Sequence, residues 1–190
     1  MKSVCLSPVV FRAAVLGLLG AAFHAPASAQ DSWTSVTSGT VVLFRHALAP
    51  GGGDPAGFKL EDCSTQRNLS PEGRAQAQSM GAEFKHRRIT VSAVWSSQWC
   101  RTRETADLAF PGQRADQPSF NSFFNAREAA VDQTKEAKRL LATWRGPGVL
   151  VVVTHQVNIT ELTGVVPASG EGVVVKPLAT GLQVVGRIAP

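Results

Sequence analysis

The stretch Val149-Leu150-Val151-Val152-Val153-Thr154 decides the fold of this chain. An apolar, β-branched run without alternation is typical of a strand that is buried on both faces of a sheet, and we place this strand at the sheet centre. It ends at His155. Thr40 to Arg45 repeats the pattern and ends at His46, where the glycines and prolines of residues 49–55 favour a loop. The sequence therefore predicts two histidines at the ends of two buried strands.

Helical patterns alternate with these strands. Ser70 is a predicted N-cap followed by a proline and an acidic residue, so a helix should run from there to about Arg87. The remaining predicted elements are a strand over 91–97, a helix carrying Arg101 to about Leu108, an amphipathic helix from Thr134 to Trp144, a short helix over 157–162, and closing strands at 172–175 and 182–185.

This alternation predicts one α/β domain. The expected architecture is a three-layer sandwich with a central, mostly parallel sheet flanked by helices. Ligands bind at the carboxyl ends of the strands in such sheets. We therefore expect His46 and His155 to face one crevice.

The first 29 residues have the pattern of a signal peptide. Lys2 and Arg12 precede the apolar run 13–23, and Ala27-Ser28-Ala29 supplies the small residues of a cleavage site. The apolar run is shorter than the roughly 20 residues that span a bilayer. We expect a single periplasmic or secreted domain over residues 30–190, with no stable membrane insertion after the signal is removed.

Composition restricts the class of partner. The chain has 19 Lys and Arg against 14 Asp and Glu, a formal charge of +5, which falls to +3 without Lys2 and Arg12. No basic stripe with aromatic platforms is present, and tyrosine is absent, so nucleic acid is not the expected partner. A phosphorylated small molecule or glycan fits the modest positive charge better.

Two cysteines, Cys63 and Cys100, remain after the predicted signal. An even count in an oxidising compartment favours one disulfide, with two free thiols as the alternative. Their separation, with no nearby pair of histidines, does not match the usual ligand spacing of zinc, so no metal is expected.

Four segments form a recognisable set, namely Arg45-His46-Ala47, residues 68–77, residues 96–106, and Val153-Thr154-His155. Together they resemble the histidine phosphatase superfamily, which has the phosphoglycerate mutase-like fold, and the resemblance spans Val41 to about Gly164. The chain is most similar to short, exported bacterial members. The resemblance implies a phosphoric monoester hydrolase that needs no cofactor and forms a phosphohistidine on His46.

The chemistry of these residues agrees with the resemblance. Neutral imidazole, with an unperturbed pKa near 6.5, is a suitable nucleophile for phosphorus, and this makes His46 the predicted catalytic carrier. Arg45 and Arg101 are the predicted substrate ligands, because guanidinium groups bind phosphate oxygens bidentately. His155 is expected to stabilise the same oxygens. Arg103 is the rival of Arg101, but the family's Ser-x-x-x-Arg-x-x-x-Thr-Ala spacing falls on Arg101.

The remaining site predictions are less specific. The backbone of Gln156 and the side chain of Asn158 are candidates for phosphate binding near a helix start, with helix capping as the alternative. Glu128 is the first candidate for the general acid and Asp54 the second, and a solvated surface role is the alternative for both. Without a general acid, alcohol leaving groups would depart about 10² to 10⁴-fold more slowly, and substrates with good leaving groups, such as a phosphohistidine, would be favoured.

The substrate is predicted only by analogy. Export points to envelope sugar phosphates such as the heptose phosphate of lipopolysaccharide core. The lack of an unambiguous general acid, together with Ala47 where the commonest family form has glycine, motivates an alternative, a non-catalytic protein that binds phosphate or phosphoglycans. No sequence feature points to an oligomeric state.

Overall fold

The computed structural model describes residues 32–189 together with Met1. The rest of the predicted signal peptide lies outside the described residues. The helices and strands are β1 (Val41–Arg45), α1 (Pro71–His86), β2 (Val91–Ser96), α2 (Cys100–Ala109), β3 (Arg114–Asp116), α3 (Ala130–Thr143), β4 (Val149–Thr154), α4 (Gln156–Thr163), β5 (Gly172–Leu178) and β6 (Gly181–Ile188). Short 3-10 helices cover Trp33–Ser35, Cys63–Thr65, Pro118–Phe120 and Arg127–Ala129.

The six strands form one mixed sheet in the order β3-β2-β4-β1-β5-β6. Four of them, β3, β2, β4 and β1, run parallel, and β5 and β6 add an antiparallel hairpin beside β1. Every residue of β4 is buried, as its continuous apolar pattern predicts. The predicted α/β fold with a mostly parallel sheet is confirmed.

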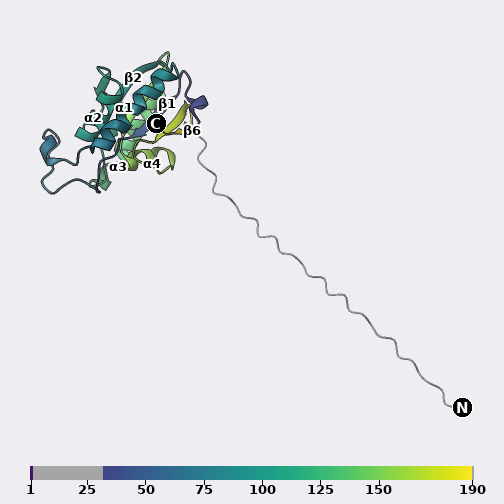
Figure 1. Ribbon diagram of the computed structural model, residues 1–190, viewed down its shortest axis with the longest axis horizontal. Helices are drawn as coiled ribbons and strands as arrows, with labels where there is room; N and C mark the ends of the chain where they lie inside the picture. The colour runs from purple at the N-terminus through teal and green to yellow at the C-terminus, as the bar shows by residue number, and fades with distance from the viewer. Residues whose placement is uncertain (2–31, 190) are drawn as a thin grey trace.

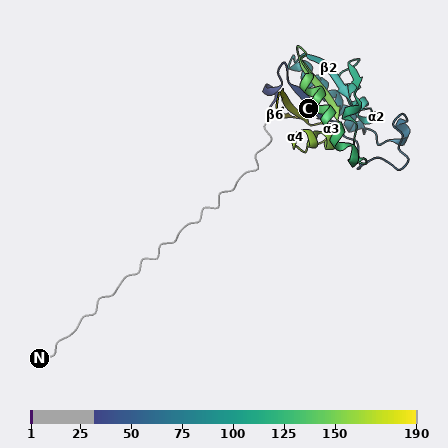
Figure 2. The same ribbon diagram turned by 180° about the vertical axis from the view of Figure 1, so that it is seen from behind.

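Helices cover both faces of the sheet. Val42 and Phe44 of β1 belong to a core with residues of α1 and α2, whereas Val41 and Leu43 belong to a core with residues of α3 and α4. This alternation follows from the period of two along a strand. Figure 1 shows α1 and α2 in front of the sheet, and Figure 2 shows α3 on the opposite side. In the part of the chain described, no helix is long and apolar enough to cross a bilayer.

Local signals predicted some boundaries better than others. The side chain of Ser70 accepts a hydrogen bond from the Gly73 N–H at 3.1 Å, so the predicted N-cap of α1 is confirmed. Helix α3 begins at Ala130, four residues before the predicted start at Thr134. Strand β3 was not predicted, because its three polar or small residues lie at the sheet edge and carry no apolar pattern.

The register of the central strands brings the two histidines together. Arg45 of β1 is the pairing partner of Thr154 of the neighbouring β4. His46 follows Arg45 and donates its backbone N–H to the Thr154 carbonyl at 2.9 Å, and His155 follows Thr154. Both histidines therefore lie at the same carboxyl edge of the sheet.

Candidate active site

A cavity of about 130 Å³ opens at the carboxyl ends of β1 and β4. This is smaller than the roughly 300 to 1,000 Å³ typical of pockets for drug-sized ligands, so the cavity suits one small group of a larger molecule. The residues that line it are Arg45, His46, Gly51, Gly52, Gly53, Asp54, Arg67, Arg101, Ser122, Phe124, His155, Gln156 and Val157.

His46 is buried, with its side chain held by the backbone of the next residue. Its Nδ1 lies 2.8 Å from the carbonyl oxygen of Ala47. Because a carbonyl only accepts hydrogen bonds, we assign the proton to Nδ1, which leaves a lone pair on Nε2. Burial, and then the positive charge of Arg101, Arg67 and Arg45, hold the pKa of His46 well below 6.5. The imidazole is therefore neutral at physiological pH, the form that a nucleophile requires.

Arg101 stands in the first turn of α2 and forms a buried ion pair in the cavity. Its Nη1 and Nη2 donate to the two carboxylate oxygens of Asp54 at 2.5 and 3.3 Å. One turn later, the Thr105 hydroxyl donates to the Arg101 carbonyl and accepts the Ala47 N–H at 3.1 Å. The four-residue spacing of Arg101 and Thr105 thus fixes the chain after His46 against the helix that carries the arginine.

Two further guanidinium groups line the cavity. Arg45 donates from Nη1 to the Pro167 carbonyl at 3.1 Å, but its buried Nε has no hydrogen-bond partner among the described residues. Arg67 donates from Nε to the Gly53 carbonyl at 2.8 Å and from Nη1 to the Ala49 carbonyl. Burial and the charge of the nearby Arg101 lower the pKa of both arginines. A site with this excess of positive charge favours an anion.

His155 packs against His46 with ring centroids 5.6 Å apart. Its Nδ1 lies 3.4 Å from Nη2 of Arg101, and its Nε2 lies 2.8 Å from the Ser97 hydroxyl. Because arginine only donates, Nδ1 is the acceptor and Nε2 carries the proton. Complete burial, and then Arg101, hold the pKa of His155 well below 6.5. The ring is neutral in this arrangement, with its Nδ1 lone pair facing Arg101.

Residues 41–120 match the model of the histidine phosphatase superfamily, branch 1. This segment belongs to the histidine phosphatase superfamily. It contains His46, Arg45, Arg67 and Arg101, whereas His155 lies beyond the matched segment. No curated protein gave a significant sequence match to the chain.

Solved structures of histidine phosphatases and their relatives share the fold. The protein histidine phosphatase SixA complexed with tungstate aligns with a TM-score of 0.52 and 15% identity, covering 80% of this chain and 97% of that one. Phosphoglycerate mutase from Thermus thermophilus aligns at 0.56 and 17%, covering 80% and 99%. An open-reading-frame product of Mycobacterium tuberculosis aligns at 0.59 and 14%, covering 79% and 97%. The phosphoglycerate mutase-like fold predicted from the sequence is confirmed.

The fold brings some of the residues predicted from the sequence to the cavity and leaves others outside its lining. His46, Arg45, Arg101 and His155 surround one cavity, and Gln156 and Asp54 also line it. Two other candidates, Asn158 and Glu128, lie apart from this lining. The general acid and the phosphate-binding role of Gln156 stay predictions.

Asn158 is not among the residues that line the cavity. It is buried, and its Nδ2 donates to the Asn121 carbonyl at 2.8 Å. Asn121 in turn accepts hydrogen bonds on Oδ1 from the Gln98 N–H and the Ser97 hydroxyl. Asn158 therefore supports the loop that holds Ser97, and its role in phosphate binding stays a prediction.

Glu128 is exposed in the 3-10 helix Arg127–Ala129 and is not part of the described lining. Asp54, the second candidate, has a buried carboxylate inside the cavity and accepts a further hydrogen bond from the Trp99 indole at 3.0 Å. The loop 49–55 brings Asp54 inward through contacts that no local sequence pattern predicts.

Sequence reasoning missed Arg67, Ser97 and Phe124 as members of the site. Arg67 directly precedes residues 68–77, one of the segments that carry the family resemblance, so its position was the signal that could have found it. Arg103, the rival of Arg101, pairs with Asp116 on β3 instead.

The departure at Ala47 is accommodated by ordinary backbone geometry. Arg88 is the one non-glycine residue with a positive φ among those described, so Ala47 does not need the freedom of glycine. Ala47 is fully buried, and both of its backbone groups are hydrogen-bonded, the N–H to Thr105 and the carbonyl to the His46 ring.

A disulfide joins Cys63 and Cys100. Cys100 is the first residue of α2 and precedes Arg101, and its N–H donates to the Gln66 side chain at 3.0 Å. The disulfide therefore ties the loop that carries Asp54 and Arg67 to the helix that carries Arg101. Within residues 32–189, no group of three His, Cys, Asp or Glu side chains is arranged to hold a metal ion.

Proposed function

We propose that this protein is an exported phosphatase that hydrolyses phosphate monoesters through a phosphohistidine on His46. The observation that supports this proposal is the neutral ring of His46 in a cavity lined by three arginines. Its Nδ1 is hydrogen-bonded to the backbone, which leaves Nε2 as the nucleophile. Phosphoryl transfer depends on positioning and on positive charge around the equatorial oxygens.

The proposed reaction has two displacements at phosphorus. Arg45, Arg67 and Arg101 bind the non-bridging oxygens, and the Nε2 lone pair of His46 attacks phosphorus. The ester P–O bond breaks, its electron pair stays on the leaving oxygen, and that oxygen takes a proton. The Nδ1–H bond to Ala47 stabilises the positive charge that forms on the ring.

A water molecule then attacks the phosphohistidine. The P–N bond breaks and its electron pair returns to Nε2 of His46, which restores the neutral ring. The water proton passes to the group that protonated the leaving oxygen, and inorganic phosphate departs. The two steps consume one water and release one alcohol and one phosphate.

Asp54 is the better-placed carboxylate for the proton transfers. It lies inside the cavity paired with Arg101, whereas Glu128 is exposed outside the lining. Phosphate oxygens that accept the hydrogen bonds of Arg101 would release Asp54 toward the leaving group.

We expect Asp54→Asn to slow the hydrolysis of alkyl phosphates by about 10²-fold and that of p-nitrophenyl phosphate much less. Glu128→Gln should change neither rate. Equal effects of both variants on alkyl phosphates would contradict this assignment.

The nucleophile is tested with p-nitrophenyl phosphate, whose leaving group needs little protonation. We expect His46→Asn to abolish turnover, and His86→Asn, a change of an exposed histidine at the end of α1, to leave it intact. Rapid quenching followed by mass spectrometry should find the phosphoryl group on His46. Full turnover in His46→Asn, or a label elsewhere, rules out the mechanism. Phosphate binding by the wild type without turnover would instead favour the phosphoglycan-binding alternative.

Export and substrate are proposed on other grounds. The tripartite N-terminus and the Cys63–Cys100 disulfide support a periplasmic or secreted protein. That location favours envelope sugar phosphates, such as lipopolysaccharide core heptose phosphate, as substrates.

Expression of the full chain in a Gram-negative host followed by fractionation should give a periplasmic protein that begins near Gln30. A cytosolic protein that keeps residues 1–29 would contradict export.

A further inference from the structure

Phe124 is an exposed aromatic residue at the mouth of the cavity. It is 48% exposed, in contrast to His46, Arg101 and His155, which are at most 3% exposed in the same lining. This difference in exposure defines an inner, charged part of the cavity and an outer part. Val157 is half-buried and accompanies Phe124 in the outer part.

The ring of Phe124 is held in place by two neighbours. The guanidinium carbon of Arg127 lies 5.4 Å from the ring centroid and covers one face. At the ring edge, a Cβ placed on Gly53 would lie 3.7 Å from Cε1, so the glycine loop 51–53 borders the ring. The ring therefore has Arg127 over one face and the Gly53 backbone near its edge, and it is half exposed while it lines the cavity.

A phosphate ester must place its two ends in these two parts of the cavity. The phosphoryl group belongs beside the buried histidines and arginines, so the leaving group extends outward past Phe124. An aromatic face offers apolar contact area to another ring at a distance set by stacking. Arg127 on the ring supports it through a cation–π contact.

We propose that Phe124, supported by Arg127, is a specificity-determining residue that favours phosphate esters whose leaving group is a ring with an apolar face. The proposal rests on the proposed phosphatase function. An aryl group or the C–H face of a sugar ring would stack on Phe124, whereas a short alkyl chain would gain little. Discrimination by this residue therefore acts on the leaving group and leaves binding of the phosphoryl group unchanged.

The experiment compares ratios of variant to wild type, so that the intrinsic reactivity of each substrate cancels. Phe124→Ala should lower kcat/KM for phenyl phosphate by up to about tenfold. It should leave kcat/KM for ethyl phosphate and inhibition by inorganic phosphate within about twofold. Glucose 1-phosphate, as a third substrate, distinguishes a sugar ring from an aromatic ring. If Phe124→Ala lowers kcat/KM for it as much as for phenyl phosphate, Phe124 recognises either kind of ring, and if the loss is smaller, it recognises aromatic leaving groups.

Matched controls separate stacking from general damage. Val131→Ala truncates another exposed apolar residue, 77% exposed on α3 and outside the lining, and should change no ratio. Arg127→Gln should reproduce part of the Phe124→Ala effect. Equal losses for phenyl and ethyl phosphate in Phe124→Ala, or no loss for phenyl phosphate, would overturn the proposal.

A binding measurement keeps this proposal separate from the phosphatase reaction. Phenylphosphonate and methylphosphonate are not hydrolysed, and calorimetry gives their affinities whether or not the wild type turns over any ester. Phe124→Ala should weaken phenylphosphonate by up to about tenfold and spare methylphosphonate. If no ester is turned over but Phe124→Ala still weakens phenylphosphonate selectively, only the phosphatase function is refuted. If Phe124→Ala binds each of the two phosphonates with the same affinity as wild type, the role of Phe124 is refuted.

Discussion

At the scale of single residues, the cavity contains more positive charge than its own groups neutralise. Asp54 pairs with Arg101, whereas the hydrogen bonds of Arg45 and Arg67 within residues 32–189 go to backbone carbonyls. Burial, and then the positive charge of Arg101, lower the pKa of both Arg45 and Arg67. A bound dianion would relieve the repulsion among these arginines, so we expect the cavity to favour an anion.

We predict that Arg67→Ala weakens phosphate ester binding. Loss of one charge-assisted hydrogen bond to the anion should lower kcat/KM by about 10- to 100-fold. Arg74→Ala is the control, because Arg74 is exposed and pairs with Glu104 on the surface. Steady-state kinetics and inhibition by inorganic phosphate provide the measurement. Unchanged inhibition in Arg67→Ala would remove Arg67 from the site.

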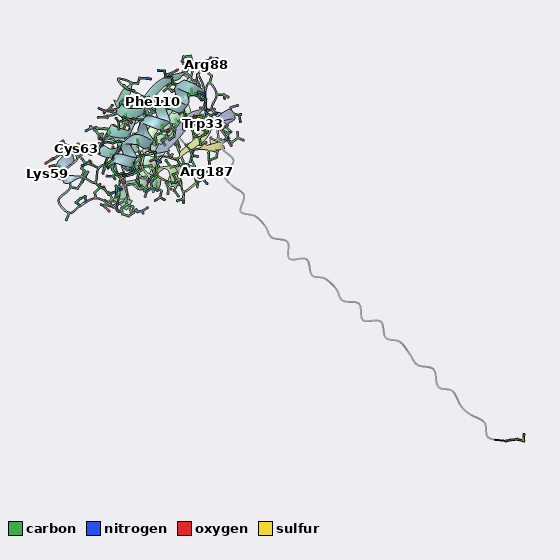
Figure 3. All side chains as sticks on the ribbon, in the orientation of Figure 1. Trp33, Lys59, Cys63, Arg88, Phe110 and Arg187 are labelled. Carbon is green, nitrogen blue, oxygen red and sulfur yellow. A yellow bond between two sulfur atoms is a disulfide. The ribbon has the colours of Figure 1, made fainter. Side chains whose placement is uncertain are left out.

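At the scale of elements, the connection from β1 to α1 carries site residues although few of its own side chains are buried. Most of residues 50–65 are exposed, and Figure 3 shows Lys59 and Cys63 at the outer end of this segment. Its anchors to the body are the disulfide, the Asp54–Arg101 ion pair, and Phe58 stacked on Trp99 with centroids 5.1 Å apart. The disulfide is therefore a support of the site as well as of the fold.

We predict that Cys63→Ser with Cys100→Ser lowers both stability and activity. Opening a loop with a sequence separation of 37 should reduce the free energy of unfolding by up to about 4 kcal/mol. The kcat/KM should fall as well, because Asp54 and Arg67 lose their fixed position against α2. Urea unfolding and kinetics measure both effects. Wild type treated with reductant should behave like the double variant, and full activity in both would contradict the supporting role.

At the scale of the whole molecule, the sheet places two buried histidines at its carboxyl edge. His46 and His155 each have a folded-state pKa held well below 6.5, first by burial and then by nearby arginines. In the unfolded chain both take up protons below about pH 6.5. The unfolded state therefore binds more protons than the folded state as the pH falls, and global stability depends on pH even above the carboxylate range.

We predict that the free energy of unfolding is highest above pH 6.5 and falls below it. Between pH 7.5 and 5.5, the two histidines should together remove at most about 3 kcal/mol. Urea denaturation at a series of pH values tests this, and His155→Gln should show a shallower dependence than wild type. A slope unaffected in His155→Gln would show that His155 takes up no extra proton on unfolding.

The amino-acid sequence by itself determined every strand of the sheet except β3, the helix that Ser70 caps, and the positions of His46 and His155 at the ends of β1 and β4. These features depend on local patterns, in which a continuous apolar run requires burial and parallel strands present their carboxyl ends on one edge. The tertiary structure alone decided that Arg67 joins the cavity, that Asp54 pairs with Arg101, and that Glu128 stays outside. Those outcomes depend on how irregular loops pack against α2, and contacts between residues far apart along the chain leave no periodic signal in the sequence.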